Sequence, residues 1–291
     1  MPYVEISGAC NANCVFCPGG PNGPRRGRFM PPALFEKILR KAKLEGFVDR
    51  VVFPYNKGEP LLHHALPEIL DVVRGLDMLV AISTNLIRLP DFDSKMLSTI
   101  QSVDVSLSGF SNYTYRLNHR GGDIRRVTSN ILSLRDLRNS AGLTFPITVK
   151  WHRYRYNEHE VEKARNYFAD EGIAFSKFFA FFGAAKEFED YYEGRFPLDK
   201  RKLVEERIFS DVIDRSVERH KNIDHCPLSD ILTITETGRV LLCCAYTNTP
   251  DSIIGDYLSL SLQEIVRAKT QKSFCAKCMA SGWAGFFAAG E

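Results

Sequence analysis

Three cysteines near the start of the chain have the spacing of a metal-cluster site. Cys10, Cys14 and Cys17 form a C-x3-C-x2-C motif, and they follow a short apolar segment, residues 2–7, that predicts a strand. A structural zinc site takes four protein ligands, and its cysteines usually come as two separated pairs. Iron–sulfur clusters are normally held by four cysteines, so three thiolates suit a cluster with one open iron. The alternatives are a zinc knuckle or buried small side chains.

The other five cysteines lie in the last part of the chain. Cys226 and Cys243 flank residues 231–242, a predicted hairpin that would bring them together, and Cys275 and Cys278 form a C-x2-C pair. Four such thiolates would close a second cluster, and the same spacings also permit a four-cysteine zinc site. Cys244 is then left over, either as a small buried side chain or as a reactive thiol.

The elements that must position these cysteines alternate between strand and helix. Strands are predicted at residues 2–7, 50–54, 79–84, 103–107, 147–154 and 175–182, and helices at 33–44, 66–74, 93–100, 126–138 and 160–170. This alternation predicts an α/β fold with a parallel sheet, a partial (β/α)6 TIM-like barrel. Composition changes after residue 183, and residues 201–217 predict one long helix. We therefore expect a barrel over 1–185, a helical linker over 186–222 and a small auxiliary-cluster domain over 223–291.

Polar residues follow the predicted strands where a parallel fold gathers its ligands. They come after strands two, three and four, and comprise Gly58, Glu59, Ser83, Asn85, Ser106 and Ser108. On strand five, Lys150, His152 and Tyr154 alternate onto one face, which points either into the barrel or outward.

The segment Cys10-Asn-Ala-Asn-Cys14-Val-Phe16-Cys17 resembles the signature of the radical S-adenosylmethionine (radical SAM) enzymes. The resemblance implies a 4Fe-4S cluster on the three cysteines, with SAM chelated by the open iron. Gly58-Glu59-Pro60 is similar to the family's Gly-Gly-Glu stretch, although Lys57 stands where the family has its first glycine. It implies that Glu59 accepts the SAM ammonium. The implied SAM contacts are Phe16, Gly58, Glu59, Ser83, Asn85, Ser106 and Ser108.

The C-terminal cysteines resemble the auxiliary-cluster domain called SPASM, and more closely its short form, twitch. The resemblance implies a second 4Fe-4S cluster on Cys226, Cys243, Cys275 and Cys278. The sequence has no cysteine after Cys278, which departs from a full SPASM domain and implies one auxiliary cluster. The Gly-x4-Cys spacing from Gly238 favours Cys243 over Cys244 as the ligand.

Composition limits the other function classes. The 291 residues are 44% hydrophobic, and 38 basic against 35 acidic residues give a net charge of +3, too small to indicate nucleic-acid binding. No apolar run approaches the ~20 residues of a membrane span, and the start does not resemble a secretion signal. Eight cysteines in such a chain indicate metal or redox chemistry rather than disulfides. We expect a cytoplasmic protein whose partners are a sugar-like small molecule or a peptide, and an external one-electron reductant such as flavodoxin or ferredoxin.

Two fates of a substrate radical separate the enzyme hypotheses. If Cys244 returns a hydrogen atom, the reaction is an epimerisation, as in radical SAM epimerases that act on aminoglycosides. If the radical gives its electron to the auxiliary cluster, the reaction is a dehydrogenation, as in the twitch-bearing aminocyclitol dehydrogenases. The leftover cysteine favours the epimerase slightly. Peptide modification is a further alternative, and a zinc-stabilised binding protein without catalysis is the non-enzyme one.

Overall fold

A parallel five-stranded sheet forms one half of the molecule. The computed structural model describes residues 2–17, 27–48, 50–247 and 249–289. The sheet has the order β2-β3-β4-β5-β6, and every neighbouring pair is parallel. Its strands are β2 (Val51–Val52), β3 (Leu79–Thr84), β4 (Ile100–Leu107), β5 (Ile147–Arg153) and β6 (Ala174–Phe179). The α/β class and the partial barrel are as the sequence predicts.

The first strand joins this sheet to a second one built from the C-terminal part of the chain. The second sheet has the order β1-β7-β8-β9, with β1 (Pro2–Val4), β7 (Leu232–Ile234), β8 (Arg239–Leu241) and β9 (Ile253–Asp256). β1 pairs in parallel with β7, and Tyr3 also forms a parallel bridge with Phe53 beside β2. β7 and β8 are antiparallel, which confirms the predicted hairpin.

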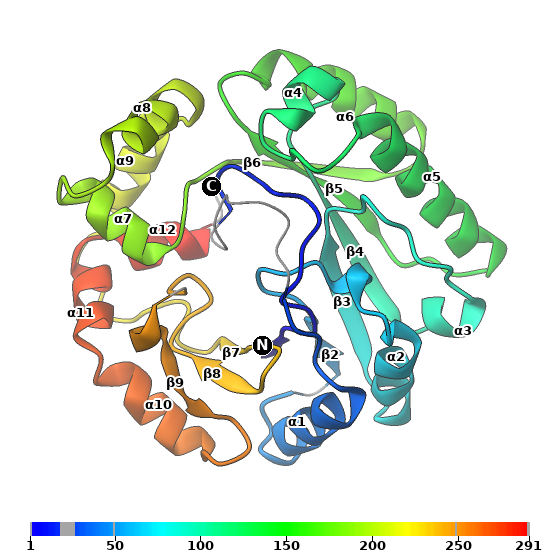
Figure 1. The fold of residues 1–291 in the computed structure, drawn as a ribbon, viewed down its shortest axis with the longest axis horizontal. Helices are drawn as coiled ribbons and strands as arrows, with labels where there is room; N and C mark the ends of the chain where they lie inside the picture. Colours follow the sequence, from blue (N-terminus) through cyan, green and yellow to red (C-terminus); the bar gives the residue numbers. More distant parts are fainter. Residues whose placement is uncertain (1, 18–26, 49, 248, 290–291) are drawn as a thin grey trace.

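Helices surround the two sheets in a ring, which Figure 1 shows along its shortest axis. The first half carries α1 (Pro32–Leu44), η1 (Pro60–Leu62), α2 (Leu66–Gly75), α3 (Ser94–Leu97), α4 (Asn112–Arg116), α5 (Ile124–Ser140), η2 (Glu158–Glu160) and α6 (Val161–Asp170). The other half carries α7 (Ala185–Tyr192), α8 (Leu198–Arg207), α9 (Ser210–Arg219), η3 (Pro250–Ser252), α10 (Leu262–Thr270), α11 (Ser273–Ala280) and α12 (Trp283–Ala289). The division at residues 185 and 222 stays a prediction.

Two predicted helices differ from the structure. The helix expected over 201–217 is broken between α8 and α9, where Ile208 is extended and fully buried. Arg155 uses the carbonyls at the break, because its backbone N–H donates to Arg207 O and its Nε donates to Ile208 O, both at 2.9 Å. The helix expected over 93–100 covers only Ser94–Leu97, since Ile100 already begins β4.

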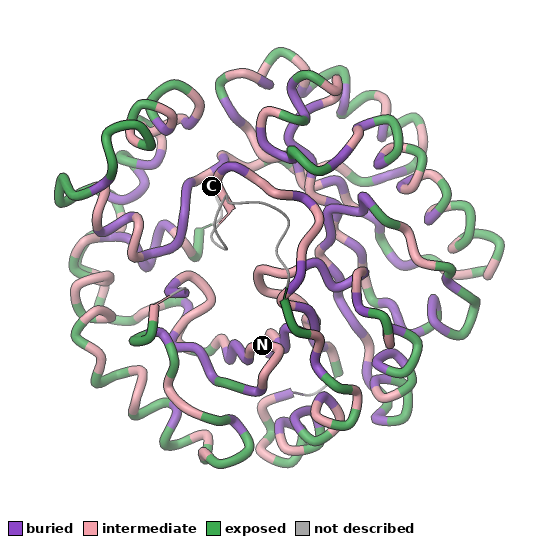
Figure 2. The backbone as a smooth tube through the Cα atoms, viewed as in Figure 1, coloured by how far each residue is buried: buried purple, intermediate pink, exposed green. Residues whose placement is uncertain are grey.

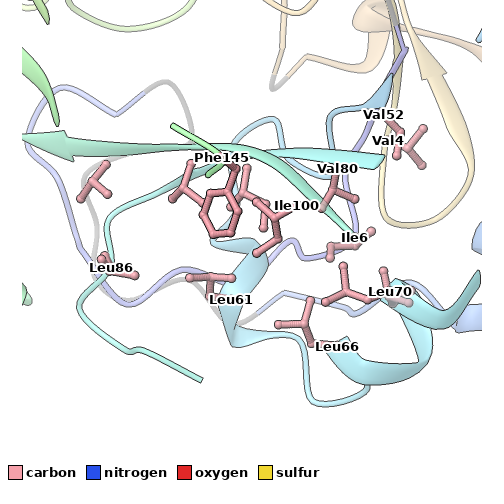
Figure 3. Close-up of a cluster of buried hydrophobic side chains, with 14 of the residues drawn as sticks. Val4, Ile6, Val52, Leu61, Leu66, Leu70, Val80, Leu86, Ile100 and Phe145 are labelled. Carbon is pink, nitrogen blue, oxygen red and sulfur yellow. The ribbon is translucent and has the colours of Figure 1, made fainter. Parts of the chain in front are cut away.

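The main hydrophobic core fills the space between the parallel sheet and its outer helices. Val80 and Ile100 from β3 and β4 are buried beside Leu61, Leu66 and Leu70 from η1 and α2, as Figure 3 shows. In Figure 2 the buried residues follow the strands and the inward sides of the helices. The outer face of the sheet is therefore used for packing, and its inner face is left for polar side chains.

Candidate active site

The three N-terminal cysteines lie together on one cavity of about 260 Å³ inside the barrel. We call it the N-terminal cysteine cavity; its lining includes Cys10, Cys14, Phe16, Cys17, Gly58, Glu59, Ser83, Asn85, Ser106, His152 and Cys244. Each of the eight cysteines of the chain is partly exposed. The structure thus brings the predicted cluster ligands to the same space as all but one of the predicted SAM contacts.

The cysteine loop is anchored by residues that the sequence analysis missed. Asn118, between α4 and α5, accepts hydrogen bonds from Val15 N at 3.1 Å and Phe16 N at 3.4 Å through its Oδ1. The backbone of His119 forms an isolated antiparallel β-bridge with that of Cys14. The Phe16 ring stacks on the Tyr154 ring with centroids 5.8 Å apart. No local sequence pattern identifies an asparagine that anchors this loop, because the contact joins segments about one hundred residues apart.

Three thiolates on one cavity are donors of the kind that an iron–sulfur cluster takes, and their ligation of a cluster stays a prediction. Within the described residues, no three His, Cys, Asp or Glu side chains are close enough to hold one metal ion. A zinc site needs its sulfurs about 2.3 Å from one ion. A cluster places each thiolate on a different iron and so accepts wider spacing. Asn85 Nδ2 donates to Cys10 Sγ at 3.7 Å, the kind of contact that supports a ligating sulfur.

Gly58 lies where no side chain would fit. A Cβ at this position would be 1.6 Å from Ser7 O, so the loop after β2 can approach the strand before the cysteines only as glycine. Glu5 holds this loop, since its Oε1 accepts from Lys57 N at 2.8 Å and from Gly58 N at 2.7 Å. Burial raises the pKa of the Glu5 carboxyl. The role of Glu5 was not predicted from the sequence.

The Glu59 carboxyl group is buried and bonded within the protein. Its Oε1 accepts from Thr84 Oγ1 at 2.6 Å and Leu61 N at 3.1 Å, and its Oε2 accepts from Asn85 N at 2.8 Å. Complete burial raises its pKa to about 7, against the effect of these hydrogen bonds. Glu59 therefore ties the loop after β2 to the end of β3. Its predicted contact with the SAM ammonium stays a prediction.

Ser108 is the one predicted SAM contact that does not line this cavity. Ser83 and Ser106 lie on strands, whereas Ser108 follows the end of β4 and is fully buried. Its Oγ lies 2.5 Å from His119 Nδ1. Burial, with a smaller effect of His152, lowers the pKa of His119 to about 3, so the imidazole is neutral. Ser108 thus supports His119 behind the cysteine loop.

The C-terminal cysteines gather on a second cavity of about 330 Å³, the C-terminal cysteine cavity. It is lined by the predicted set Cys226, Cys243, Cys275 and Cys278. Hydrogen bonds from the Cys244 thiol and from the Ala245 N–H, at 3.4 Å, lower the pKa of Cys243. Such a shift favours the thiolate that metal binding requires.

Lys269 on α10 also lines the C-terminal cysteine cavity, and the sequence analysis missed it. Its Nζ donates to Ile231 O at 2.6 Å and Ser229 O at 3.1 Å, in the turn after Cys226. Burial lowers the pKa of this ammonium, and the surrounding cysteines oppose the shift. A partly buried cation beside four thiols matches an anionic group in this cavity.

Cys243 and Cys244 line different cavities. Cys243 belongs to the C-terminal cysteine cavity, while Cys244 belongs to the N-terminal cysteine cavity with Cys10 and Cys14. The Cys244 thiol also hydrogen-bonds to the Cys243 sulfur, so the pair lies at the boundary between the two cavities. The leftover thiol is therefore adjacent to the predicted radical-generating site.

Comparisons with known proteins agree with this geometry. The model of the Radical SAM superfamily matches residues 4–167, more than half of the chain. A protein of Methanothermobacter thermautotrophicus described as "Probable GTP 3',8-cyclase" is 29% identical over 161 residues, 54% of this chain and 50% of the relative. The chain thus spans about half the length of that curated relative.

Solved structures share the fold at low sequence identity. "Native anSMEcpe with bound AdoMet" aligns over 96% of this chain and 82% of its own, with a TM-score of 0.58 and 14% identity. Streptococcus suis SuiB aligns over 98% and 71%, with a TM-score of 0.61 and 15% identity. In the described residues, no helix is long and apolar enough to span a membrane. With the family model matched across the cysteine loop and the parallel strands, the chain belongs to the radical SAM superfamily.

Proposed function

We propose that this protein reductively cleaves SAM and epimerises a carbon centre of an aminoglycoside-like sugar, with Cys244 as the hydrogen-atom donor. The observation that carries the proposal is that Cys244 lines the same cavity as Cys10, Cys14 and Cys17. When bound and reduced, the cluster and SAM supply methionine and a 5′-deoxyadenosyl radical that removes a hydrogen atom from the substrate. The family relationship and the SAM-bound fold neighbour support this first half of the reaction.

Cys244 performs the second half. A thiol S–H bond is weaker than most C–H bonds, so a substrate carbon radical takes the hydrogen atom from Cys244 Sγ, and a thiyl radical remains. If the atom arrives on the face opposite to the abstraction, the carbon is inverted. The thiyl radical regains a thiol by taking one electron and one proton. A one-electron reductant of the flavodoxin or ferredoxin class would supply the electron, and Cys226, Cys243, Cys275 and Cys278 would hold a second cluster beside Cys244.

A dehydrogenase is the second candidate, and His152 favours it. His152 lines the N-terminal cysteine cavity, and burial lowers its pKa to about 4, so its imidazole is neutral and can accept a hydrogen bond from a substrate hydroxyl. The substrate radical would then pass its electron to a cluster on Cys226, Cys243, Cys275 and Cys278. Peptide modification would use the same groups on an amino-acid residue.

The deciding experiment compares the wild type with Cys244→Ala in deuterated water under anaerobic conditions, with single-ring aminoglycoside precursors that carry at most one amino group as substrates. An epimerase incorporates one solvent deuterium at the inverted carbon, and Cys244→Ala still forms 5′-deoxyadenosine but no epimer. Lys95→Gln is the control, because Lys95 pairs with Asp71 on the outer surface and lines neither cysteine cavity. A product two hydrogens lighter, formed equally well by Cys244→Ala, would establish the dehydrogenase instead. Iron-free protein with zinc at both sites would reject both enzymes.

A further inference from the structure

We propose that a third cavity inside the barrel is the substrate subsite, and that it selects a cyclic polyol with at most one charged amino group over a polycation. This inference rests on the proposed function, and it narrows the substrate from aminoglycoside-like sugars in general to single rings that carry at most one ammonium group. The cavity has a volume of about 450 Å³, within the range of small-molecule sites. It shares Ser83, Ser106, His152 and Phe181 with the N-terminal cysteine cavity. A ligand there would adjoin both Cys244 and the predicted cluster.

One side of this cavity is polar and comes from three neighbouring strands. Ser83 is in register with Asp104, and Ser106 with Lys150, so these side chains share the inner face of the sheet. Hydroxyl donors and acceptors in a row suit a ligand that carries several hydroxyl groups.

The other side of the cavity is aromatic. It is formed by Phe178 and Phe179 of β6, Phe181 after that strand, and Phe286 and Phe287 of α12. Aromatic rings pack against apolar surface, and the axial C–H groups of a sugar or cyclitol ring provide one. A cavity with hydroxyl partners on one wall and aromatic rings on the other fits a ring with a polar edge and an apolar face.

The charges of the cavity limit the charge of its ligand. Asp104 Oδ2 lies 3.7 Å from Lys150 Nζ, and the two side chains are 34% and 37% exposed. They are the charged side chains among the residues that line this cavity, and together they are neutral. Asp104 can exchange its lysine partner for one ligand ammonium. Several ammonium groups would need further carboxylates, and they would face Lys150 at close range.

Binding to the full-length, SAM-loaded protein tests the subsite without turnover. The probes are glucose, glucosamine and kanamycin, which carry zero, one and several ammonium groups, measured anaerobically by calorimetry or by ligand-observed NMR. We expect glucose and glucosamine to bind and kanamycin to be excluded. Lys150→Gln should raise the affinity for glucosamine relative to glucose about tenfold, because Asp104 is freed for one charged hydrogen bond. Asp104→Asn should lower the ratio of the affinity for glucosamine to the affinity for glucose.

Lys95→Gln is the matched control, since Lys95 pairs with Asp71 at 2.9 Å on the outer surface and should leave the ratios unchanged. Tighter binding of kanamycin than of either hexose overturns the proposal, and so does failure of both hexoses to bind at tens of millimolar. Unchanged ratios in Lys150→Gln and Asp104→Asn also overturn it. Cys244→Ala should bind like the wild type, so a failure of the hydrogen-donor proposal is seen separately from a failure of the subsite.

Discussion

Glu59 Oε1 and Thr84 Oγ1 lie 2.6 Å apart, and this contact links the loop after β2 to the end of β3. Both residues line the N-terminal cysteine cavity, so the contact fixes the relative position of two predicted SAM-binding segments. Because the carboxyl group is completely buried, its charge state is coupled to folding.

We predict that Glu59→Gln removes a pH dependence of stability. The pKa of Glu59 is about 7 in the folded protein, above the value of about 4.3 for an exposed glutamate. The folded state therefore holds a proton that the unfolded state has lost between these values, and the contribution of Glu59 to the free energy of unfolding falls as pH rises through this window. The loss is on the order of 3 kcal/mol.

Urea unfolding of SAM-free protein at pH 5 and pH 8 measures this effect. The control is Glu36→Gln on the outer side of α1, whose exposed carboxylate pairs with Arg40. An equal pH dependence in wild type and Glu59→Gln would contradict the prediction.

Gly58→Ala should destabilise the protein and weaken SAM binding. The added Cβ would lie 1.6 Å from Ser7 O, so the loop must shift away from the cysteine segment. We expect a loss of about 2 kcal/mol in the free energy of unfolding, and a higher Kd for SAM in the reconstituted protein. Gly75→Ala is the control, because a Cβ there meets no atom within 4 Å. Normal SAM affinity in Gly58→Ala would show that the loop does not contact the cofactor.

The iron content should divide between the two cysteine sets. Replacing Cys10, Cys14 and Cys17 together by alanine should remove half of the iron and sulfide of anaerobically reconstituted protein. Replacing Cys275 and Cys278 should remove the other half. Elemental analysis and electron paramagnetic resonance measure both. Zinc in place of iron in the triple variant would instead indicate a structural zinc site in the C-terminal cysteine cavity.

Lys269→Met should lower the midpoint potential of the auxiliary cluster. Lys269 is a partly buried cation among the C-terminal cysteines, and its charge favours the more negative, reduced form of a cluster. Lys269→Arg should keep the potential near that of the wild type. The titration is followed by electron paramagnetic resonance in the variant that lacks Cys10, Cys14 and Cys17. Lys37→Met, on the exposed side of α1, is the control, and a potential unchanged by Lys269→Met would reject the role.

The sequence predicted the groups whose positions follow from local spacing. Cys10, Cys14 and Cys17 lie within one loop, and Ser83 and Ser106 lie on strands whose inner faces follow from alternation. Ser108 lies beyond the end of β4, so the alternation of strand residues did not predict the position of its side chain.

Groups that act across long sequence separations were missed. Asn118 reaches the cysteine loop, Glu5 holds the Gly58 loop, and Lys269 enters a cavity through the packing of α10. Cys243 and Cys244 are adjacent in the sequence, and the Gly-x4-Cys spacing only favoured Cys243 as the ligand. Only the tertiary structure says which of them faces which cavity.

The parallel pairing of Pro2–Val4 with Leu232–Ile234 has a consequence for folding during synthesis on the ribosome. One side of this strand bonds to Phe53, but its other side waits for a partner some 230 residues later, which at 5–20 residues per second is on the order of ten seconds or more. During that interval the unpaired backbone groups at one strand edge of the nascent barrel are exposed and can pair with strands of other chains. Delayed closure also leaves the cysteine loop reachable from outside, a period in which the cell's cluster-assembly machinery would have access to it.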